Sequence, residues 1–390
     1  MRGIKDRVAI IGMGCTKFGE RWESGPADLI VEAAYEAYED AGIDPKDVQA
    51  AWLGTVQTFR TGQPLAQALK LDYVPITRVE NACATATDAF RNASYAVAAG
   101  VYDIVLALGV EKLKDSGFSG LAVGEGVTSG VEPPTPPPSQ FAMAATRYFH
   151  HYGIPYEEGK RVLAQIASKN HHNGTLNPKA HFQREVSVEQ IMKAPMIAWP
   201  LGLYDCCGVS DGAAAAIITT PEIARSLRPD HVLVKGLGLS VGSFGMLRDD
   251  WDFVHFPENV RAAQAAYQEA EVTAPREEID LAIVHDCFTI TELIIAEDLG
   301  FSARGRGRDD VEAGAFTLEG DLPINTDGGL KCFGHPIGAS GIRMIYEVYK
   351  QLQGRAGQRQ LQKADLGLTH NLGGRPGSFT ASVSLFGRAE

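Results

Sequence analysis

The chain has 390 residues, of which 45% are hydrophobic and 22% charged, and its formal net charge is −12. This length fits two or three domains, or one duplicated unit. The acidic balance argues against nucleic acid and against an anionic membrane surface as partners. No apolar run reaches the roughly 18 residues of a membrane span. The N-terminus lacks the apolar core of a signal peptide, so we expect a cytoplasmic protein.

Apolar runs alternate with helical patterns along the chain, which predicts an α/β layered fold with a mostly parallel sheet. In the first half, strands are expected at 8–12, 51–56, 104–108 and 213–219, with helices at 26–41 and 85–99. In the second half, strands are expected at 232–236, 281–285, 366–369 and 379–385, with helices at 260–270, 289–299 and 341–352.

The two halves look like copies of one unit. VAIIGMG at 8–14 is echoed by VLVKGLG at 232–238, and DIVLALG at 103–109 by DLGLTHN at 365–371. A period of this length indicates a duplicated domain rather than a solenoid. We therefore predict one half from 1–114 plus 206–225 and the other from 226–390.

The halves differ by a long insertion at 115–205, which we expect to form a lid or ligand-binding domain because long insertions in compact domains are usually functional. Its stretch 160–193 has six Lys or Arg residues against two acids. An acidic protein that binds a phosphate-rich ligand needs such a local basic surface, although a solvated mixed-charge surface is the alternative.

Six cysteines in 390 residues are too sparse for a disulfide scaffold, and they lack the paired spacing of a zinc site. We expect free thiols in a reducing compartment and no metal site. Cys83, in VENACATATDAF, falls where a strand leads into a helix. The helix dipole and amide groups there lower a thiol pKa, which makes Cys83 a candidate nucleophile. A small buried residue is the competing interpretation.

Two further segments carry reactive side chains. His285, Asp286 and Cys287 follow one another at the end of an expected buried strand, where α/β sheets gather ligands. His335 lies in the glycine-rich run TDGGLKCFGHPIGASG, which suits a general base or an oxyanion donor. We predict that Cys83, Cys287 and His335 converge between the two halves.

Taken together, these segments resemble the thiolase superfamily over nearly the whole chain. NACATATDAF is similar to the thiolase nucleophile motif, and GHPIGASG to its GHP motif. The resemblance implies a thiolase fold, in which two βαβαβαββ halves form a five-layer αβαβα core with an inserted loop domain. It also implies that Cys83 carries the acyl group and that His335 activates Cys83.

Two departures are similar to the sterol-carrier-protein type thiolases. HDCF stands at 285–288 where most thiolases have Asn-Glu-Ala-Phe, and the HNLGG loop has no second cysteine. The resemblance then implies that Cys287 acts as acid and base in place of the missing cysteine. His285 takes the position of the oxyanion-hole Asn, and the Gly373 amide joins that of Cys83 in a second oxyanion hole.

The resemblance further implies acyl transfer that forms or cleaves a 3-oxoacyl-coenzyme A. Coenzyme A enters as substrate, with no bound cofactor. A homodimer is implied, as is a small zinc-ribbon/OB-fold partner that helps bind coenzyme A. The loop-domain position suggests that Lys169, Lys179, Arg184 and Lys193 contact the coenzyme A phosphates. Two alternatives are a retro-aldolase on acyl-coenzyme A side chains and a non-catalytic acyl-coenzyme A or lipid carrier.

Overall fold

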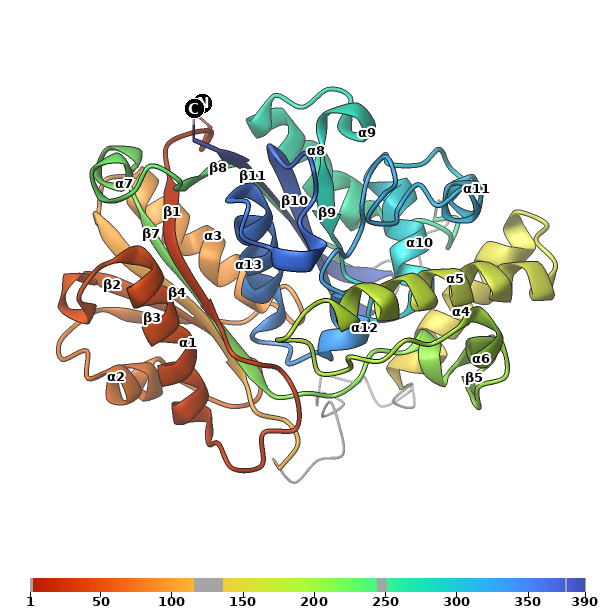
Figure 1. The fold of residues 1–390 in the computed structure, drawn as a ribbon, viewed down its shortest axis with the longest axis horizontal. Coiled ribbons are helices and arrows are strands. Elements are labelled where there is room, and N and C mark those ends of the chain that lie inside the picture. Colours follow the sequence, from red (N-terminus) through yellow and green to blue (C-terminus); the bar gives the residue numbers. More distant parts are fainter. Residues whose placement is uncertain (1–2, 116–135, 244–250, 376, 390) are drawn as a thin grey trace.

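The computed structural model describes residues 3–115, 136–243, 251–375 and 377–389. Nine strands form one continuous sheet in the order β3-β2-β4-β7-β1-β8-β11-β10-β9 (Figure 1). The strands are β1 (Ala9–Cys15), β2 (Ala50–Gly54), β3 (Ile76–Val79), β4 (Ile104–Glu111), β7 (Gly212–Thr219), β8 (Val232–Val241), β9 (Leu281–Ile283), β10 (Leu366–Arg375) and β11 (Ser378–Arg388). The eight strands expected in the two halves are present, and β3 is the strand expected to lead into the Cys83 turn.

The strand order is mirrored about the contact between β1 and β8, where Ala9 pairs with Leu233 and Ile10 with Val232. In each half the first strand lies beside the last, followed by the last but one and then the second. The position of β3 is taken in the second half by a single bridge from Ala282 to Ile324. This mirrored order supports the predicted duplication. The exact domain boundaries stay a prediction.

The expected mostly parallel sheet is wrong. Parallel pairing is confined to β2 with β3, β2 with β4 and β9 with β10, whereas the other five neighbouring pairs are antiparallel. The last strand of each half, β7 or β11, runs against its neighbours on both sides. Every residue of β7 is buried. Its continuous apolar run therefore reports burial on both faces and carries no information about strand direction.

Helices and sheet alternate in five layers. Helix α1 (Pro26–Ala41) covers β1 and β7, and α8 (Pro257–Ala270) covers β8 and β11. Helices α3 (Thr85–Ala98) and α13 (Ser340–Leu352) pack together between the two halves of the sheet. This confirms the predicted αβαβα arrangement. The smaller α2 (Gln63–Leu69), α7 (Pro221–Leu227), α9 (Pro275–Glu278) and α11 (Gly307–Glu312) lie outside this core.

The repeated Gly-x-Gly of the two halves has one physical reason. A Cβ on Gly14 would stand 2.0 Å from the carbonyl oxygen of Ala33 in α1. A Cβ on Gly238 would stand 1.9 Å from the carbonyl oxygen of Ala262 in α8. Both distances are far below contact, so only glycine lets each outer helix approach its strand so closely. The sequence echo between the halves therefore marks equivalent helix–sheet packing.

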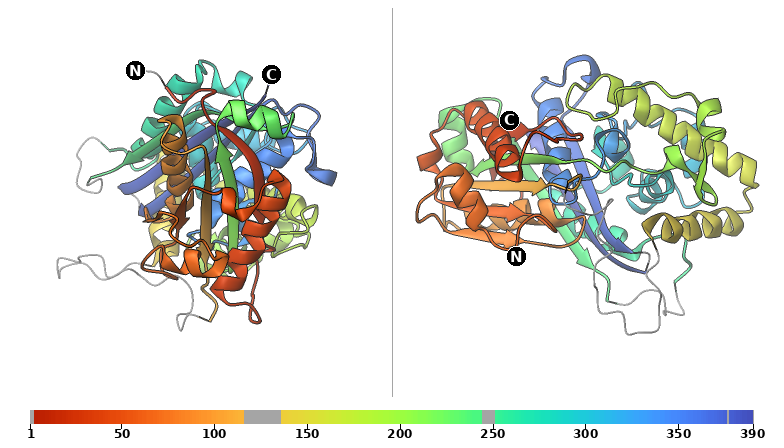
Figure 2. Two further views of the ribbon diagram at one scale, coloured as in Figure 1. Left: turned by 90° about the vertical axis from the view of Figure 1, so that its left-hand side faces the viewer. Right: turned by 90° about the horizontal axis from the view of Figure 1, so that it is seen from below.

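The helices and the hairpin of the insertion pack beside the second half (Figures 1 and 2), whereas Lys179 of the segment after α5 reaches Glu36 in α1. The insertion contains α4 (Pro137–His151), α5 (Tyr156–Thr175), α6 (Val188–Met192) and the hairpin of β5 (Met196–Ala198) and β6 (Leu201–Gly202). Residues 116–135 of the predicted insertion lie outside the described residues. Helix α5 contacts α10 (Thr289–Asp298) and α12 (Gly329–Phe333) of the second half.

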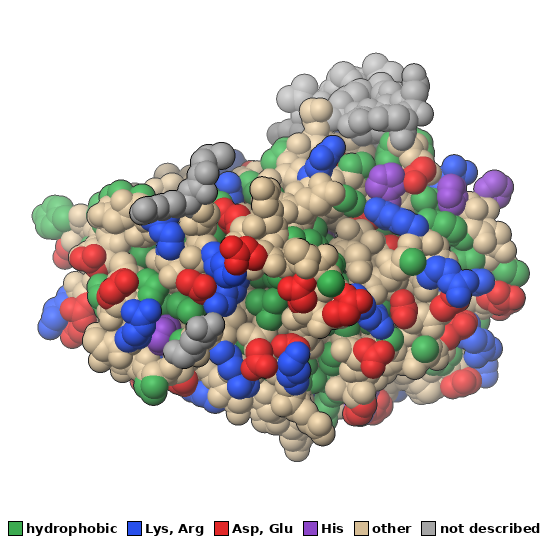
Figure 3. Space-filling view, turned by 90° about the horizontal axis from the view of Figure 1, so that it is seen from above, with side chains coloured by type: hydrophobic (Ala, Val, Ile, Leu, Met, Phe, Trp, Pro, Cys, Tyr) green, Lys and Arg blue, Asp and Glu red, His purple; other side chains and the backbone are tan. Residues whose placement is uncertain are grey.

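Acidic and basic side chains are interspersed on the face seen in Figure 3, with hydrophobic groups scattered singly among them. Within the described ranges, no helix combines the length and the hydrophobicity that crossing a bilayer requires.

Candidate active site

Cys83 lies in a tight turn between β3 and α3. Ala82 before it has φ of +48°, an uncommon left-handed conformation for a residue with a side chain. The Thr85 hydroxyl donates to the carbonyl of Ala82 and accepts from the N–H of Asn81 at 2.8 Å. These local bonds hold the turn and present Cys83 two residues before the first turn of α3, as the sequence predicts.

His335 lies in the glycine-rich loop between α12 and α13. Gly334 before it has φ of +75°, and a Cβ there would stand 2.0 Å from the Ser210 hydroxyl oxygen. Nδ1 of His335 lies 2.8 Å from the hydroxyl oxygen of Ser340, and this hydroxyl donates to the carbonyl of Pro336. The hydroxyl therefore accepts from Nδ1–H, which leaves the lone pair of the neutral ring on Nε2.

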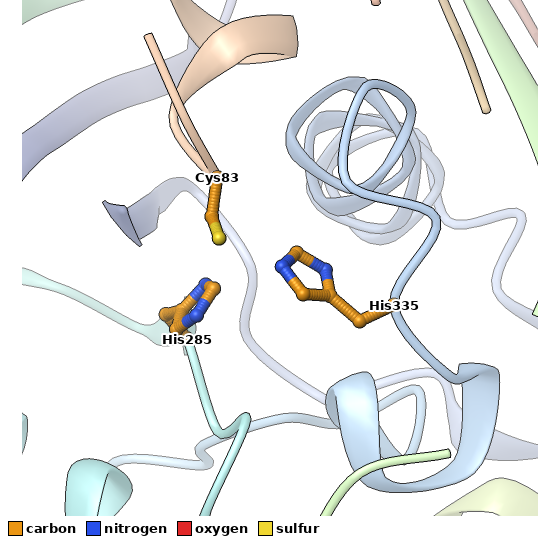
Figure 4. Close-up of side chains that lie close together, drawn as sticks. All are labelled: Cys83, His285 and His335. Atoms are coloured by element: carbon orange, nitrogen blue, oxygen red, sulfur yellow. The ribbon is translucent and has the colours of Figure 1, made fainter. Parts of the chain in front are cut away.

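His285 completes a three-residue cluster. It follows β9, and its ring stands at 82° to that of His335 with the ring centroids 5.0 Å apart. The Cys83 sulfur and one ring nitrogen from each histidine all lie within 4.8 Å of one another. Figure 4 shows the three side chains pointing toward one another, with the Nε2 edge of His335 facing Cys83. The histidines are 1% and 4% exposed, and Cys83 is half-buried.

Burial controls the ionisation of these groups. It lowers the pKa of His335 to about 3, with Arg343 adding a smaller effect, and it lowers that of His285 well below the usual range. Burial also raises the pKa of Cys83 to about 12, against the opposing effect of backbone amides. The expectation that the helix terminus makes Cys83 a thiolate is therefore wrong for the free protein, because desolvation outweighs the amides. A neutral base beside the thiol is needed.

Cys287 is buried next to this cluster. Its sulfur lies 3.9 Å from the hydroxyl oxygen of Thr291, and its carbonyl accepts from the N–H of Cys207 at 2.9 Å. Burial raises its pKa well above the ordinary value, followed by the neighbouring thiols of Cys207 and Cys83. Its sulfur is not part of the set within 4.8 Å. The predicted convergence of Cys287 with Cys83 and His335 therefore stays a prediction, and among the described residues His285 is the third member of the cluster within 4.8 Å.

Gly373, near the end of β10, supports the backbone of Cys83. A Cβ on Gly373 would stand 2.4 Å from the Cys83 nitrogen, so this strand can approach the nucleophile turn only with glycine there. The amide that lowers the pKa of Cys83 belongs to the next residue, Gly374. The backbone amides of Gly374 and of Cys83 itself therefore act on the sulfur, and the predicted role of the Gly373 amide in an oxyanion hole stays a prediction.

Two positioning residues are absent from the sequence-based set. Ser340 fixes the ring of His335, and Glu111 at the end of β4 is fully buried. The Glu111 carboxylate accepts from the backbone N–H groups of Val56, Gln57 and Thr58 in the first half and from that of Gly338 in the second, at 2.7 to 3.0 Å. The sequence signal that could have identified Glu111 is its position at the end of a buried strand.

The four basic residues predicted to bind coenzyme A have different environments. The prediction is wrong for Lys169, because its 10% exposed side chain donates to Glu292 at 2.5 Å and to the Ile324 carbonyl at 2.8 Å. Lys179 lies 2.7 Å from Glu36. Arg184 and Lys193 are exposed. Only the last two present charge that no described carboxylate neutralises.

The donor set of Cys83, His285 and His335 also has the chemistry of a zinc site. Their atoms converge without a carboxylate, so this cluster could hold a soft metal ion as well as a reacting thioester.

The chain matches family models over most of its length. "Thiolase, N-terminal domain" matches residues 8–222, and "Thiolase C-terminal domain-like" matches residues 245–387. An acetyl-CoA acetyltransferase of Methanothermobacter thermautotrophicus is 40% identical, covering 98% of this chain and 99% of the relative. Sterol carrier protein 2 of Bos taurus is 32% identical over 95% of this chain and 70% of its own length.

Two solved structures share the fold. The "Ltp2-ChsH2(DUF35) aldolase" has a TM-score of 0.86 and 26% identity, covering 99% of this chain and 98% of its own. A monomeric SCP2-thiolase like protein type 1 from Mycobacterium smegmatis has a TM-score of 0.78 and 19% identity, covering 98% and 78%. With both family domains matched and the reactive cluster at their junction, the chain belongs to the thiolase family of acyltransferase enzymes, in its sterol-carrier-protein type branch.

Proposed function

We propose that this enzyme forms or cleaves a 3-oxoacyl-coenzyme A through an acyl group held on Cys83. The observation that carries the proposal is the convergence of the Cys83 sulfur with two neutral, buried imidazoles. A thiol whose pKa is about 12 is a poor nucleophile until a base takes its proton. The Nε2 lone pair of His335 faces the sulfur and is available for that proton.

In the first half-reaction, the Cys83 proton passes to His335 Nε2 while the sulfur bonds to the thioester carbon. Backbone N–H groups of Cys83 and of Gly373 and Gly374 in β10 stabilise the oxyanion, with His285 beside the sulfur. The carbon–sulfur bond to coenzyme A then breaks, and the proton on His335 leaves with the coenzyme A thiol. The product is an acyl-enzyme.

In the second half-reaction, the acyl group moves to a carbon nucleophile or to free coenzyme A. We propose that the Cys287 thiolate takes the α-carbon proton during condensation. The carbanion then displaces Cys83 from the acyl group, and the proton passes from Cys287 to the released Cys83 thiolate; cleavage runs the same steps in reverse. Support comes from its location beside Cys83, whose thiol is among the groups that raise the pKa of Cys287. Burial favours the protonated thiol, so Cys287 must lose its proton before it can act as a base.

The similarity to the Ltp2-ChsH2(DUF35) aldolase favours a second candidate, a retro-aldolase acting on acyl-coenzyme A side chains. An aldolase has no need for the acylated thiol, and neither has a lipid carrier. The test is to mix the protein with acetyl-coenzyme A, quench in acid and measure the intact mass. We expect one acetyl group on the wild type and none on Cys83→Ala.

Cys15 supplies a matched control for this experiment. Burial raises its pKa to about 12 as well, but it lies beside Lys179 and Glu36 rather than beside histidines. Cys15→Ala should be acetylated like the wild type. A wild-type protein that stays unmodified while retaining aldol cleavage would replace the thiolase proposal by the aldolase.

We further propose a cytoplasmic homodimer. The six free cysteines suit a reducing compartment, and a twofold dimer is the commonest oligomer. A small zinc-ribbon/OB-fold partner is proposed because the aldolase neighbour is named as a complex with a DUF35 protein. Sedimentation of the purified chain at micromolar concentration tests the dimer, and co-purification from the native source tests the partner.

A further inference from the structure

A cavity of about 450 Å³ with several basic side chains in its lining lies between the segment that follows α5 and the C-terminal part of α13. Lys179 and Gln183 line it from the insertion, and Tyr346, Lys350, Arg355 and Gln358 line it from the second half. It is remote from the reactive cluster. Ser340, which contacts His335, and Lys350 are separated by about 15 Å along the axis of α13 at 1.5 Å per residue.

Positive charge exceeds negative charge around this cavity. Lys179 is paired with Glu36 at 2.7 Å, and Arg355 with Asp40 at 2.7 Å. The Lys350 ammonium has as its nearest described carboxylate the same oxygen of Asp40, at 3.8 Å. That distance is beyond a hydrogen bond. Asp40 also lies 3.6 Å from Arg228. Four cations therefore share Glu36 and Asp40, and Lys350 has the longest of these contacts.

Lys350 is also held in place and largely removed from bulk water. It is 8% exposed, and its ammonium lies 5.0 Å from the centre of the Tyr346 ring. The Lys179 ammonium lies 5.5 Å from the same ring, so two cations flank one aromatic side chain. Burial lowers the pKa of Lys350, and Arg355 and Lys179 lower it further against the attraction of Asp40.

The charged groups that pack around Lys350 come from three elements. Helix α1 supplies Glu36 and Asp40, the segment after α5 supplies Lys179, and the chain beyond α13 supplies Arg355. Arg359, which also lines the cavity, is already neutralised by three hydrogen-bonding contacts to Glu347 at 2.8 to 3.0 Å. It adds no free charge to the cavity.

We propose that this cavity binds a phosphate group, with Lys350 at its base and Lys179, Arg355 and Gln358 at its rim. A phosphate has several strong acceptor oxygens, so it can accept from these separate donors at once. A cation would be repelled, and an apolar ligand would leave Lys350 unpaired. The phosphate can belong to inorganic phosphate or to a phosphorylated nucleotide. This site does not depend on the proposed function.

Binding is tested by calorimetry at constant ionic strength, with inorganic phosphate as one probe and adenosine 3′,5′-bisphosphate as the other. Wild type should bind at least one probe in the millimolar range or tighter, and Lys350→Met should weaken that binding at least tenfold. If Lys350→Met weakens the binding of both probes equally, the cavity recognises the phosphate group itself. Binding of the bisphosphate alone identifies a nucleotide as its source.

The control is Lys363→Met, which removes an exposed lysine paired with Asp280 elsewhere on the second half. It should bind like the wild type. Arg355→Gln is a second variant at a more exposed cation, 43% exposed at the side chain, and should weaken binding less than Lys350→Met. Thermal unfolding without phosphate checks folding, and phosphate should raise the Tm of wild type but not of Lys350→Met. Absence of binding by wild type, or full binding by Lys350→Met, would overturn the proposal.

Discussion

His335 and Ser340 form a hydrogen-bonded pair, with 2.8 Å between Nδ1 and the hydroxyl oxygen. Because the hydroxyl proton is donated to the Pro336 carbonyl, the pair sets the tautomer of the imidazole. The base lone pair then lies on Nε2, toward Cys83. The hydrogen bond from Nδ1 of His335 to Ser340, at the start of α13, thus determines which ring nitrogen can accept the thiol proton.

Ser340→Ala should slow acylation of Cys83 about 10- to 100-fold, which is part of the roughly 10²- to 10⁴-fold that a general base provides. The ring would lose its tautomer and orientation while the cysteine stays intact. Single-turnover acetylation followed by intact mass gives the rate. Ser340→Thr keeps a hydroxyl and should recover most of it. If Ser340→Thr is as slow as Ser340→Ala, packing rather than the hydrogen bond is responsible.

Cys287→Ala should separate the two half-reactions. Acetylation of Cys83 should proceed at a rate near that of the wild type, because the base for this step is His335. Condensation and cleavage of the carbon–carbon bond should fall by at least about 100-fold with loss of the acid/base group. Thiolysis assayed by coenzyme A release, set against single-turnover acetylation, shows the split. Equal losses in both assays would remove Cys287 from the proton transfer.

Micromolar zinc should inhibit the enzyme by binding Cys83, His285 and His335. The three donors lie within 4.8 Å of one another, and thiolate and imidazole are the ligands that zinc prefers. A chelator should restore full activity, and the chelator alone should cost none. Titration calorimetry should show that Cys83→Ala binds zinc much more weakly. Undiminished zinc affinity in that variant would place the inhibitory ion elsewhere.

Acid should destabilise the fold through its buried histidines. Burial lowers the pKa of His370 to about 3, below the value of about 6.5 in the unfolded chain. Between these values the unfolded state binds more protons, so stability falls as the pH falls from 6.5 toward 3. One such histidine contributes up to about 1.4 kcal/mol per pH unit.

His370→Gln isolates this effect. Two aspartates, Asp286 and Asp298, have pKa values raised to about 7, and they oppose the histidines over the same range. Their contribution is common to both proteins, so it cancels in the difference. Urea unfolding at pH 6.5, 5.5 and 4.5 should give a shallower slope of stability against pH for His370→Gln. Identical slopes would show that His370 is not neutral in the folded state.

Lys169 and the exposed pair Arg184 and Lys193 should respond differently to neutralisation. Lys169→Met leaves Glu292 buried without its cation and should lower the free energy of unfolding by about 3–5 kcal/mol. Arg184→Gln with Lys193→Gln should leave stability nearly unchanged, raise KM for coenzyme A a few-fold at low salt and spare kcat. An unchanged KM at low salt would move the phosphate contacts to a partner protein.

Sequence patterns located the chemistry well where it depends on local backbone. The Cys83 turn and the His335 loop follow from small residues and glycines that are read directly along the chain. The mixed direction of the sheet could not be read in this way. A buried strand such as β7 is apolar whichever way it runs. Its direction relative to its neighbours depends on how the long connecting segments return the chain to the sheet.

Charge patterns were the weaker guide because a sequence count treats every lysine as exposed. Lys160 and Lys169 belong to the same basic stretch, yet both form ion pairs with buried carboxylates, those of Asp205 and Glu292. Those partners lie 45 and 123 residues away, so no local window contains the pair. Ser340 lies only five residues from His335. It was not predicted because a serine at the start of a helix is common and does not by itself indicate a role in the site.

Because Glu111 hydrogen-bonds to both halves, assembly of the active site depends on the folding of both halves. The Glu111 carboxylate joins the 55–58 loop of one half to Gly338 of the other, across 227 positions of sequence. Closing so long a loop is costly in entropy, and contacts of this kind form late in folding. A chain with one half collapsed and the other still open would hold Cys83 and His335 apart. Recovery of Cys83 acetylation during refolding should therefore lag behind the recovery of helix signal, and neither half expressed alone should become acetylated.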